Sequence, residues 1–234
     1  MLQDLSGVAP TDIPLDDKET MSIFNSTDAL GVTPEQIGSE VGTYGIPEYG
    51  TKFARGMLVD TRPTSFDELI RLSGLSHGTD VWLGNAQTLI EEGVVTLKEA
   101  ICCRDDIMVY LMKRGLPPDK AFKIMETVRK GKALKDPEKW EGFKAVMKEF
   151  DIPEWYVKSC EKIKYMFPKA HAAAYVISAF RIAWYKVHMP VYFYASWYSS
   201  KATDVDVVSM IKGYDRIKQR LEDIFVKEKK KGDL

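Results

Sequence analysis

The sequence predicts an all-α fold with a central buried helix at about residues 168–188. Helix-start residues, followed by apolar residues three and four positions apart, recur along the chain from Thr61 onward. No alternating apolar and polar run is long enough to predict a strand. Residues 168–188 are apolar on almost every side of a helix, which is typical of a buried helix.

The pattern divides the chain into three segments. Residues 1–60 are rich in Pro, Gly, Thr and Asp and predict loops and short helices, one of which starts at Thr33 and Pro34. Residues 61–213 carry the strong helix signals and predict one helical domain. Residues 214–234 predict a charged C-terminal helix whose lysine-rich end frays.

Short motifs mark the helix boundaries within the helical domain. Ser65 with Glu68 three residues later forms a capping box, and Gly74 stands in a stop position. Later boundaries are marked by prolines: Pro137 after Asp136, Pro153 after Asp151, and Pro190 at the end of the central helix. A short aromatic helix is expected after Pro190.

Charge is distributed unevenly, although the net charge is only -1. Residues 1–51 hold nine acidic residues and one basic residue, residues 104–135 hold nine basic and four acidic ones, and residues 152–201 hold seven basic and two acidic ones. Clustered Lys and Arg indicate a surface for a polyanion, but they also solvate ordinary helix faces. Charge alone favours the second interpretation.

Composition excludes several classes of protein. Cys102, Cys103 and Cys160 fit neither a disulfide framework nor a CxxC metal site, and they indicate a reducing, cytoplasmic compartment. The most apolar stretch, residues 170–189, contains two histidines, an arginine and a lysine, which argues against a membrane span. No signal peptide is expected at the start of the chain.

The first candidate site is RLSGLSHGTDVWLGNA, residues 71–86. Gly74 and Gly78 allow backbone N–H groups to approach a ligand, and the start of the following helix favours an anion. The polar residues between the two glycines are Ser76 and His77. An ordinary helix–helix turn, with Asp80 as the next N-cap, explains the same residues and is favoured on this motif alone.

The second candidate is METVRKGKALK, in which four cations occupy seven residues. They are Arg129, Lys130, Lys132 and Lys135. Such a cluster can satisfy the negative end of a helix dipole, but four cations exceed what one helix end needs. Contact with phosphate groups is therefore favoured.

The third candidate is KYMFPKAHAAAYV, at the start of the central helix. Lys169 lies in the first turn, where the helix dipole disfavours a cation unless an anion binds the same end. His171 and Tyr175 share one face with Ser178 and Ile182, which suits a flat ring. A buried helix whose polar side chains find partners in the core explains the pattern equally well, and both interpretations stay open.

No self-contained catalytic set is visible. Asp105 and Asp106 are adjacent, so their side chains diverge on a helix, and they are interpreted as acids of a first helical turn. The three histidines are far apart in the sequence and form neither a triad nor a zinc pattern. We therefore expect no catalytic residue and no metal ligand in this chain.

Four long blocks resemble one family. They are SGLSHGTDVWLGNAQ, CRDDIMVYLMKRGL, AFKIMETVRKGK and IKYMFPKAHAAAYVISAFRIAWYKVHMPVYFYASWY. In order and spacing they are similar to the PolC-type DNA polymerase III of low-GC Gram-positive bacteria, and the resemblance runs from about Ser26 to Gly213. It implies that residues 61–213 are the helical fingers of a replicative polymerase and that the acidic residues 1–60 connect palm to fingers.

The resemblance also implies roles for particular residues. The loop with Ser76, His77 and Gly78 would line the nucleotide pocket, and Lys169, His171 and Tyr175 would place a charge and a ring near the incoming nucleotide. The cations suited to the triphosphate or the template backbone are Arg129, Lys130 and Lys132, with Arg104 and Arg114 as weaker candidates.

The implied cofactor and partners follow from the same family. Mg²⁺ would be bound by palm aspartates upstream of this chain, so the chain is expected to be an inactive fragment of a DNA-directed DNA polymerase. Its partners would be primer-template DNA, dNTPs and the palm, thumb and exonuclease domains, with the sliding clamp bound only through regions outside the chain. Two alternatives are a non-catalytic helical module that binds nucleic acid or protein, and a stand-alone hydrolase with His77 or His171 as base, which lacks a nearby catalytic set.

Overall fold

The computed structural model describes residues 1–232, with side chains placed through residue 227. Over that range the regular elements are helices, and extended pairing is limited to a single antiparallel bridge between Thr79 and Tyr165. The all-α prediction is confirmed. Asp233 and Leu234, together with the side chains of residues 228–232, lie outside the described part, so the predicted fraying of the lysine-rich end stays a prediction.

The helices follow one another closely in the chain. The α-helices are α1 (Leu2–Ser6), α2 (Lys18–Ser22), α3 (Pro34–Ile37), α4 (Lys52–Thr61), α5 (Phe66–His77), α6 (Gln87–Glu91), α7 (Arg104–Lys113), α8 (Pro118–Arg129), α9 (Pro137–Glu149), α10 (Glu154–Lys162), α11 (Lys169–His188), α12 (Pro190–Ser200), α13 (Val207–Met210) and α14 (Tyr214–Gly232). Shorter helical turns are η1 (Pro10–Asp12), η2 (Asp28–Leu30) and η3 (Trp82–Ala86).

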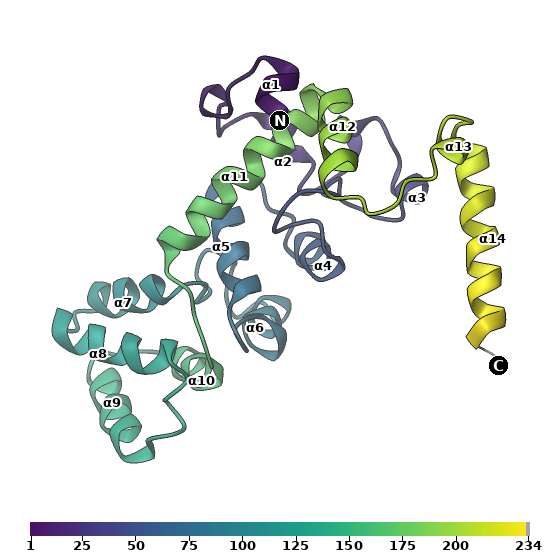
Figure 1. Ribbon diagram of the computed structural model, residues 1–234. Coiled ribbons are helices and arrows are strands. Elements are labelled where there is room, and N and C mark those ends of the chain that lie inside the picture. Colours follow the sequence, from purple (N-terminus) through teal and green to yellow (C-terminus); the bar gives the residue numbers. More distant parts are fainter. Residues whose placement is uncertain (233–234) are drawn as a thin grey trace.

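Helix α11 is the longest helix of the body and connects its two ends (Figure 1). Helices α7, α8, α9 and α10 gather at the end where α11 begins, and α1, α2 and α12 gather at the other end. Helix α5 packs directly against α11 in the middle. Helices α13 and α14 pack on each other and stand apart from the body in this view.

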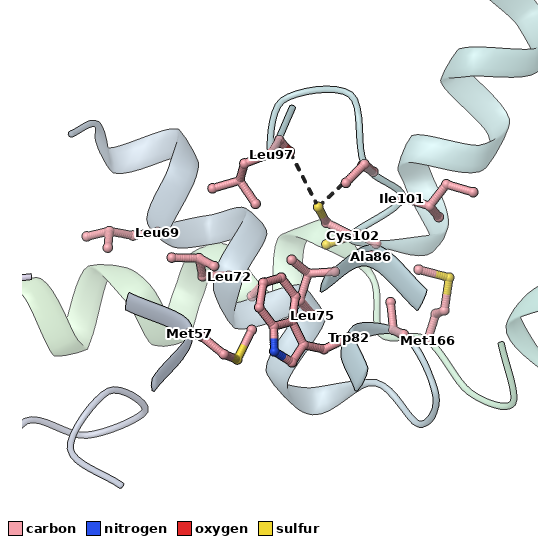
Figure 2. Packing of buried hydrophobic residues seen from close by; sticks show 14 of the residues in the cluster. Met57, Leu69, Leu72, Leu75, Trp82, Ala86, Leu97, Ile101, Cys102 and Met166 are labelled. Atoms are coloured by element: carbon pink, nitrogen blue, oxygen red, sulfur yellow. Dashed lines mark hydrogen bonds between the residues drawn. The ribbon is translucent and has the colours of Figure 1, made fainter. Parts of the chain in front are cut away.

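The core forms where α5 meets the loops around it (Figure 2). Leu69, Leu72 and Leu75 come from one face of α5, because they are three residues apart, and all three are buried; Leu75 lies close to Trp82 of η3. Fully burying a side chain of this size contributes about 1.5–3 kcal/mol. The thiol of Cys102 lies beside them, 3.3 Å from the carbonyl oxygen of Ala100, and burial raises its pKa.

Helix α11 is central, but its burial is one-sided. Ala172, Val176 and Phe180 are buried, as expected for packing residues. Ala174 is exposed and Tyr175 is 48% exposed. The apolar pattern of this helix therefore overstated its burial, because alanine is small enough to stand on an exposed face at little cost.

The local helix signals are mostly confirmed. The capping box predicted at Ser65 forms, with the Ser65 N–H donating to Glu68 Oε2 over 3.1 Å, and the helix predicted to start at Thr33 and Pro34 does so. Asp136 accepts a hydrogen bond from the backbone N–H of Lys139 at the start of α9. Asp151 differs, because α10 begins after Pro153 and has no side-chain cap.

The predicted stop at Gly74 is wrong. Helix α5 continues for three residues to His77, and Gly74 lies inside it, buried. A Cβ added at this position would lie 2.5 Å from Sγ of Cys103 and 2.6 Å from the carbonyl oxygen of Cys102. The glycine allows the close approach of the 102–103 segment to α5, rather than ending the helix.

A buried lysine joins the first quarter of the chain to α11. Lys186 is 3% exposed, and its ammonium donates to the carbonyl oxygens of Gly42 (2.7 Å) and Tyr44 (2.6 Å). Burial lowers the pKa of Lys186 to about 8. Two residues on, His188 Nε2 lies 2.8 Å from Asp17 Oδ2, so part of the acidic first quarter contacts this end of α11.

We expect Gly74→Ala to destabilise the protein by about 1–3 kcal/mol, because the added methyl group overpacks the contact with Cys102 and Cys103. Gly142→Ala on α9 is the matched control, since its Cβ would meet nothing within 4 Å. It should stabilise by about 0.5–1 kcal/mol through the loss of backbone freedom in the unfolded state. Urea unfolding of the two variants measures both changes in the free energy of unfolding. Equal effects would contradict the packing role of Gly74.

Candidate nucleic-acid interface

The start of α11 is capped by another helix. The backbone N–H of Lys169 donates to Asp105 Oδ2 over 2.7 Å, and the N–H of Arg104 donates to the carbonyl oxygen of Phe167 over 3.1 Å. Helices α7 and α11 therefore meet at their starts. The anion expected at the start of α11 is a carboxylate of the chain itself, and Asp105 is, as predicted, an acid of a first helical turn.

The side chain of Lys169 also has a partner within the chain. Its Nζ lies 3.0 Å from Asp67 Oδ1, while Oδ2 of the same carboxylate accepts from Arg71 Nε over 2.9 Å. Partial burial acts to raise the pKa of Asp67, but the hydrogen bonds from Arg71 and Lys169 leave that pKa below its ordinary value. The Lys169 side chain is 38% exposed, so it also reaches solvent.

Four rings lie in contact beside Lys169, and we call them the aromatic row: Tyr165, Phe167, His171 and Tyr175. Phe167 and His171 are stacked with their centroids 4.8 Å apart, and the His171 and Tyr175 centroids are 4.6 Å apart. Tyr165 and Tyr175, at the two ends, are both exposed. Exposed rings of this kind offer a surface on which a nucleobase can stack.

His77 extends the aromatic row from α5. Its ring lies 6.0 Å from that of Phe167, edge to face. Its Nδ1 is 2.7 Å from the carbonyl oxygen of Ser73, and its Nε2 is 2.5 Å from Glu48 Oε2. The hydroxyl of Ser76 donates to the same Ser73 carbonyl over 3.0 Å. Both ring nitrogens therefore have oxygen partners, which fix the ring beside Phe167.

The glycine after His77 has a packing role. A Cβ added at Gly78 would collide with Val81 and lie 3.0 Å from the carbonyl oxygen of Tyr165. Its neighbour Thr79 forms the bridge to Tyr165, with the Thr79 N–H donating over 2.9 Å. Asp80 is not the N-cap proposed for the alternative helix–helix turn, because the following turn has no side-chain cap.

The basic loop, residues 129–135, follows α8. Arg129 and Lys130 both pair with Glu126, and the Lys130 Nζ lies 2.8 Å from its carboxylate. Hydrogen bonds from Arg129 and then Lys130 lower the pKa of Glu126 to about 2. Lys132 and Lys135 are exposed and make no ion pair with any described residue.

The basic loop lies against the segment that leads to the aromatic row. The N–H of Met166 donates to the carbonyl oxygen of Arg129 over 3.2 Å. Gly131 has φ +61°, and a Cβ there would collide with the backbone of Lys164. These contacts bring Arg129 to the segment that carries Tyr165 and Phe167, the first two rings of the aromatic row.

Two predicted cations lie at opposite ends of α7. Arg104 is at its start, with Nε 3.9 Å from Asp105 Oδ2, and so belongs with Lys169. Arg114 follows the last turn, with its guanidinium over the ring of Tyr110 at 5.4 Å. A helix of ten residues is about 15 Å long, so the structure does not bring Arg114 to the other candidates.

Known proteins match this chain closely. The family model for the bacterial DNA polymerase III alpha subunit finger domain matches residues 2–151. The chain belongs to this family. The resemblance noted in the sequence is confirmed.

Relatives extend the similarity over almost the whole chain. DNA polymerase III PolC-type from Oceanobacillus iheyensis is 60% identical over 227 residues, which is 97% of this chain. The protein of the same name from Streptococcus sanguinis is 58% identical over 229 residues. That from Staphylococcus haemolyticus is 59% identical over 225 residues. The fingers chain spans 15–16% of the length of these relatives.

The described part of the fingers lacks a metal site. Among residues 1–227, no group of three or more His, Cys, Asp or Glu side chains is placed to hold a metal ion. None of the helices in the described range combines the length and apolar composition that a membrane crossing requires.

Sequence reasoning missed several residues of the interface. Tyr165 and Phe167 precede the predicted helix within KYMFPKAH, and their aromatic character was a usable signal. Glu126 was also within reach, because it stands three and four residues before Arg129 and Lys130, the spacing of helical ion pairs. The Asp67–Lys169 and Glu48–His77 pairs carry no local signal, since the partners are far apart in the chain, although the spacing of Asp67 and Arg71 predicts their helical ion pair.

We expect Glu126→Gln to strengthen binding of the chain to single-stranded DNA, because it frees Arg129 and Lys130 from their carboxylate. Each cation that becomes available should steepen the dependence of log K on log salt by about 0.7. A salt titration of oligonucleotide binding measures this. Glu138→Gln is the control with the same charge change, because Glu138 is exposed and makes no ion pair with a described residue. Identical behaviour of the two variants would rule out the basic loop as a phosphate contact.

Proposed function

We propose that this chain is the fingers part of a replicative DNA-directed DNA polymerase and that it binds the incoming dNTP and the template during 5′-to-3′ synthesis. One observation carries the proposal: three separate motifs meet at one surface. Lys169 lies in the sequence between Phe167 and His171 of the aromatic row, and the N–H of Met166, next to Phe167, donates to the carbonyl oxygen of Arg129 in the basic loop. Rings beside cations suit a nucleotide, which has a flat base and charged phosphates.

The proposed roles divide by chemistry. The aromatic row and His77, with Ser76 and Gly78 behind it, form the surface for a base. The triphosphate or the template backbone is contacted by cations near the start of α11 and in the basic loop. These cations are Lys169, Arg104, Arg129, Lys130 and Lys132. Arg114 lies apart from these cations and contacts a more distant stretch of the DNA backbone.

The chemistry asked of these residues is positioning and charge neutralisation. Phosphoryl transfer spreads negative charge over the transferred group, and fixed cations stabilise that charge without rearranging. Holding the reactants in line lowers the entropic cost of the reaction. Both tasks need well-placed side chains in the fingers rather than a nucleophile or a base.

Other parts of the proposed polymerase complete the site. Mg²⁺ ions held by palm aspartates outside this chain would activate the primer 3′-hydroxyl. The proposed partners are primer-template DNA, dNTPs and the palm, thumb and exonuclease domains, with the sliding clamp contacted through other regions. The proposed compartment is the cytoplasm, in keeping with three free, buried cysteines.

Lys169→Ala tests the assignment most directly. The chain replaces the matching segment of the Oceanobacillus iheyensis relative, and single-nucleotide incorporation is measured with and without the substitution. We expect kcat/KM for dNTP to fall about 10- to 100-fold, because one charge-assisted hydrogen bond to the triphosphate contributes about 1.5–3 kcal/mol. Arg129→Ala should lower it in the same direction.

Lys120→Ala is the matched control, because Lys120 is exposed on α8 and makes no ion pair with a described residue. It should leave incorporation unchanged. Normal kinetics in both Lys169→Ala and Arg129→Ala would contradict the proposed site. The isolated chain, given Mg²⁺, primer-template and dNTPs, should extend no primer, and extension would contradict its dependence on a palm.

A further inference from the structure

The carboxylate of Asp67 has two cationic partners of unequal accessibility. Oδ1 contacts Lys169 Nζ at 3.0 Å, and Oδ2 accepts from Arg71 Nε at 2.9 Å. The Arg71 side chain is only 16% exposed, whereas that of Lys169 is 38% exposed. Arg71 is therefore the fixed partner of Asp67, and Lys169 is the partner that can leave.

The backbone of Lys169 stays in place when its side chain moves. Its N–H is held by Asp105 from the first turn of α7, and this bond does not involve the ammonium. The side chain has four rotatable bonds beyond a fixed Cα, so the ammonium can leave Asp67 without any change in the backbone. No helix has to shift for this exchange.

Asp67 can lose Lys169 at little cost. It is the second residue of α5, where the N-terminal end of the helix favours a negative charge. It also keeps the hydrogen bond from Arg71, one turn further along the same helix. The carboxylate is thus stabilised with or without Lys169.

We propose that Asp67 is a positioning residue that holds the Lys169 ammonium until a nucleoside triphosphate displaces it. This inference rests on the proposed function, because it takes Lys169 as a triphosphate contact. The arriving triphosphate exchanges with a carboxylate rather than capturing a free cation. Asp67 therefore weakens nucleotide binding while it keeps Lys169 ordered and neutralised in the empty site.

The proposal predicts an effect opposite to that of an ordinary stabilising residue. In the polymerase that carries this chain, Asp67→Asn should lower KM for dNTP about two- to fivefold, the range expected for removing one exposed competing ion pair. The turnover number should not rise, because the contact at the phosphates is the same once it has formed. Asp119→Asn is the control, since it removes the same charge from the first turn of α8.

The decisive measurement is a double-mutant cycle on Asp67 and Lys169. Asp67→Asn should lower KM when Lys169 is present and leave it unchanged in the Lys169→Ala background. Thermal unfolding of each variant checks that the fold persists, and Asp67→Glu, which keeps the carboxylate, should behave like the unsubstituted protein.

Each outcome has a distinct meaning. If Asp67→Asn raises KM, or changes it equally in both backgrounds, Asp67 does not hold Lys169 against the nucleotide and the inference is overturned. If Lys169→Ala itself has no effect on incorporation, the proposed site fails first. If Lys169→Ala is impaired and Asp67→Asn acts only through Lys169, both stand.

Discussion

The architecture depends on polar contacts at the two ends of α11. At its start, the N–H of Lys169 is capped by Asp105 from α7, and near its end the ammonium of Lys186 is buried between the carbonyl oxygens of residues 42 and 44. A buried charge without partners is strongly destabilising, so the segment around Gly42 has to stay against this end of the helix. The helices at the two ends of the body are thereby attached to α11, and α5 packs along the middle of α11.

Three of the candidate cations are neutralised by carboxylates of the chain itself. Arg129 and Lys130 share Glu126, and Lys169 lies against Asp67. The surface is therefore less positive than a count of Lys and Arg suggests. A polyanion bound at these residues would exchange one set of ion pairs for another, and the loss of side-chain entropy would be smaller than for cations that were previously free.

Features decided by neighbouring residues could be predicted from the sequence. The capping box at Ser65 and the cap at Asp136 depend on partners three residues away, and both form. Gly74 was misread because its role depends on Cys103, which lies 29 positions further along the chain, and local rules do not include that contact. The candidate site residues were chosen by residue type and stay a prediction, whereas the Asp67–Lys169 pair joins residues 102 positions apart and carries no local signal.

The contact between the basic loop and the segment before α11 has a mechanical consequence. Met166 is bonded to the carbonyl of Arg129, and Gly131 touches the backbone of Lys164 with no room for a side chain. These are main-chain contacts, which cannot be relieved by a change of rotamer. The end of α8 and residues 164–166 therefore move together, so any displacement of α8 also displaces the neighbouring rings of Tyr165 and Phe167.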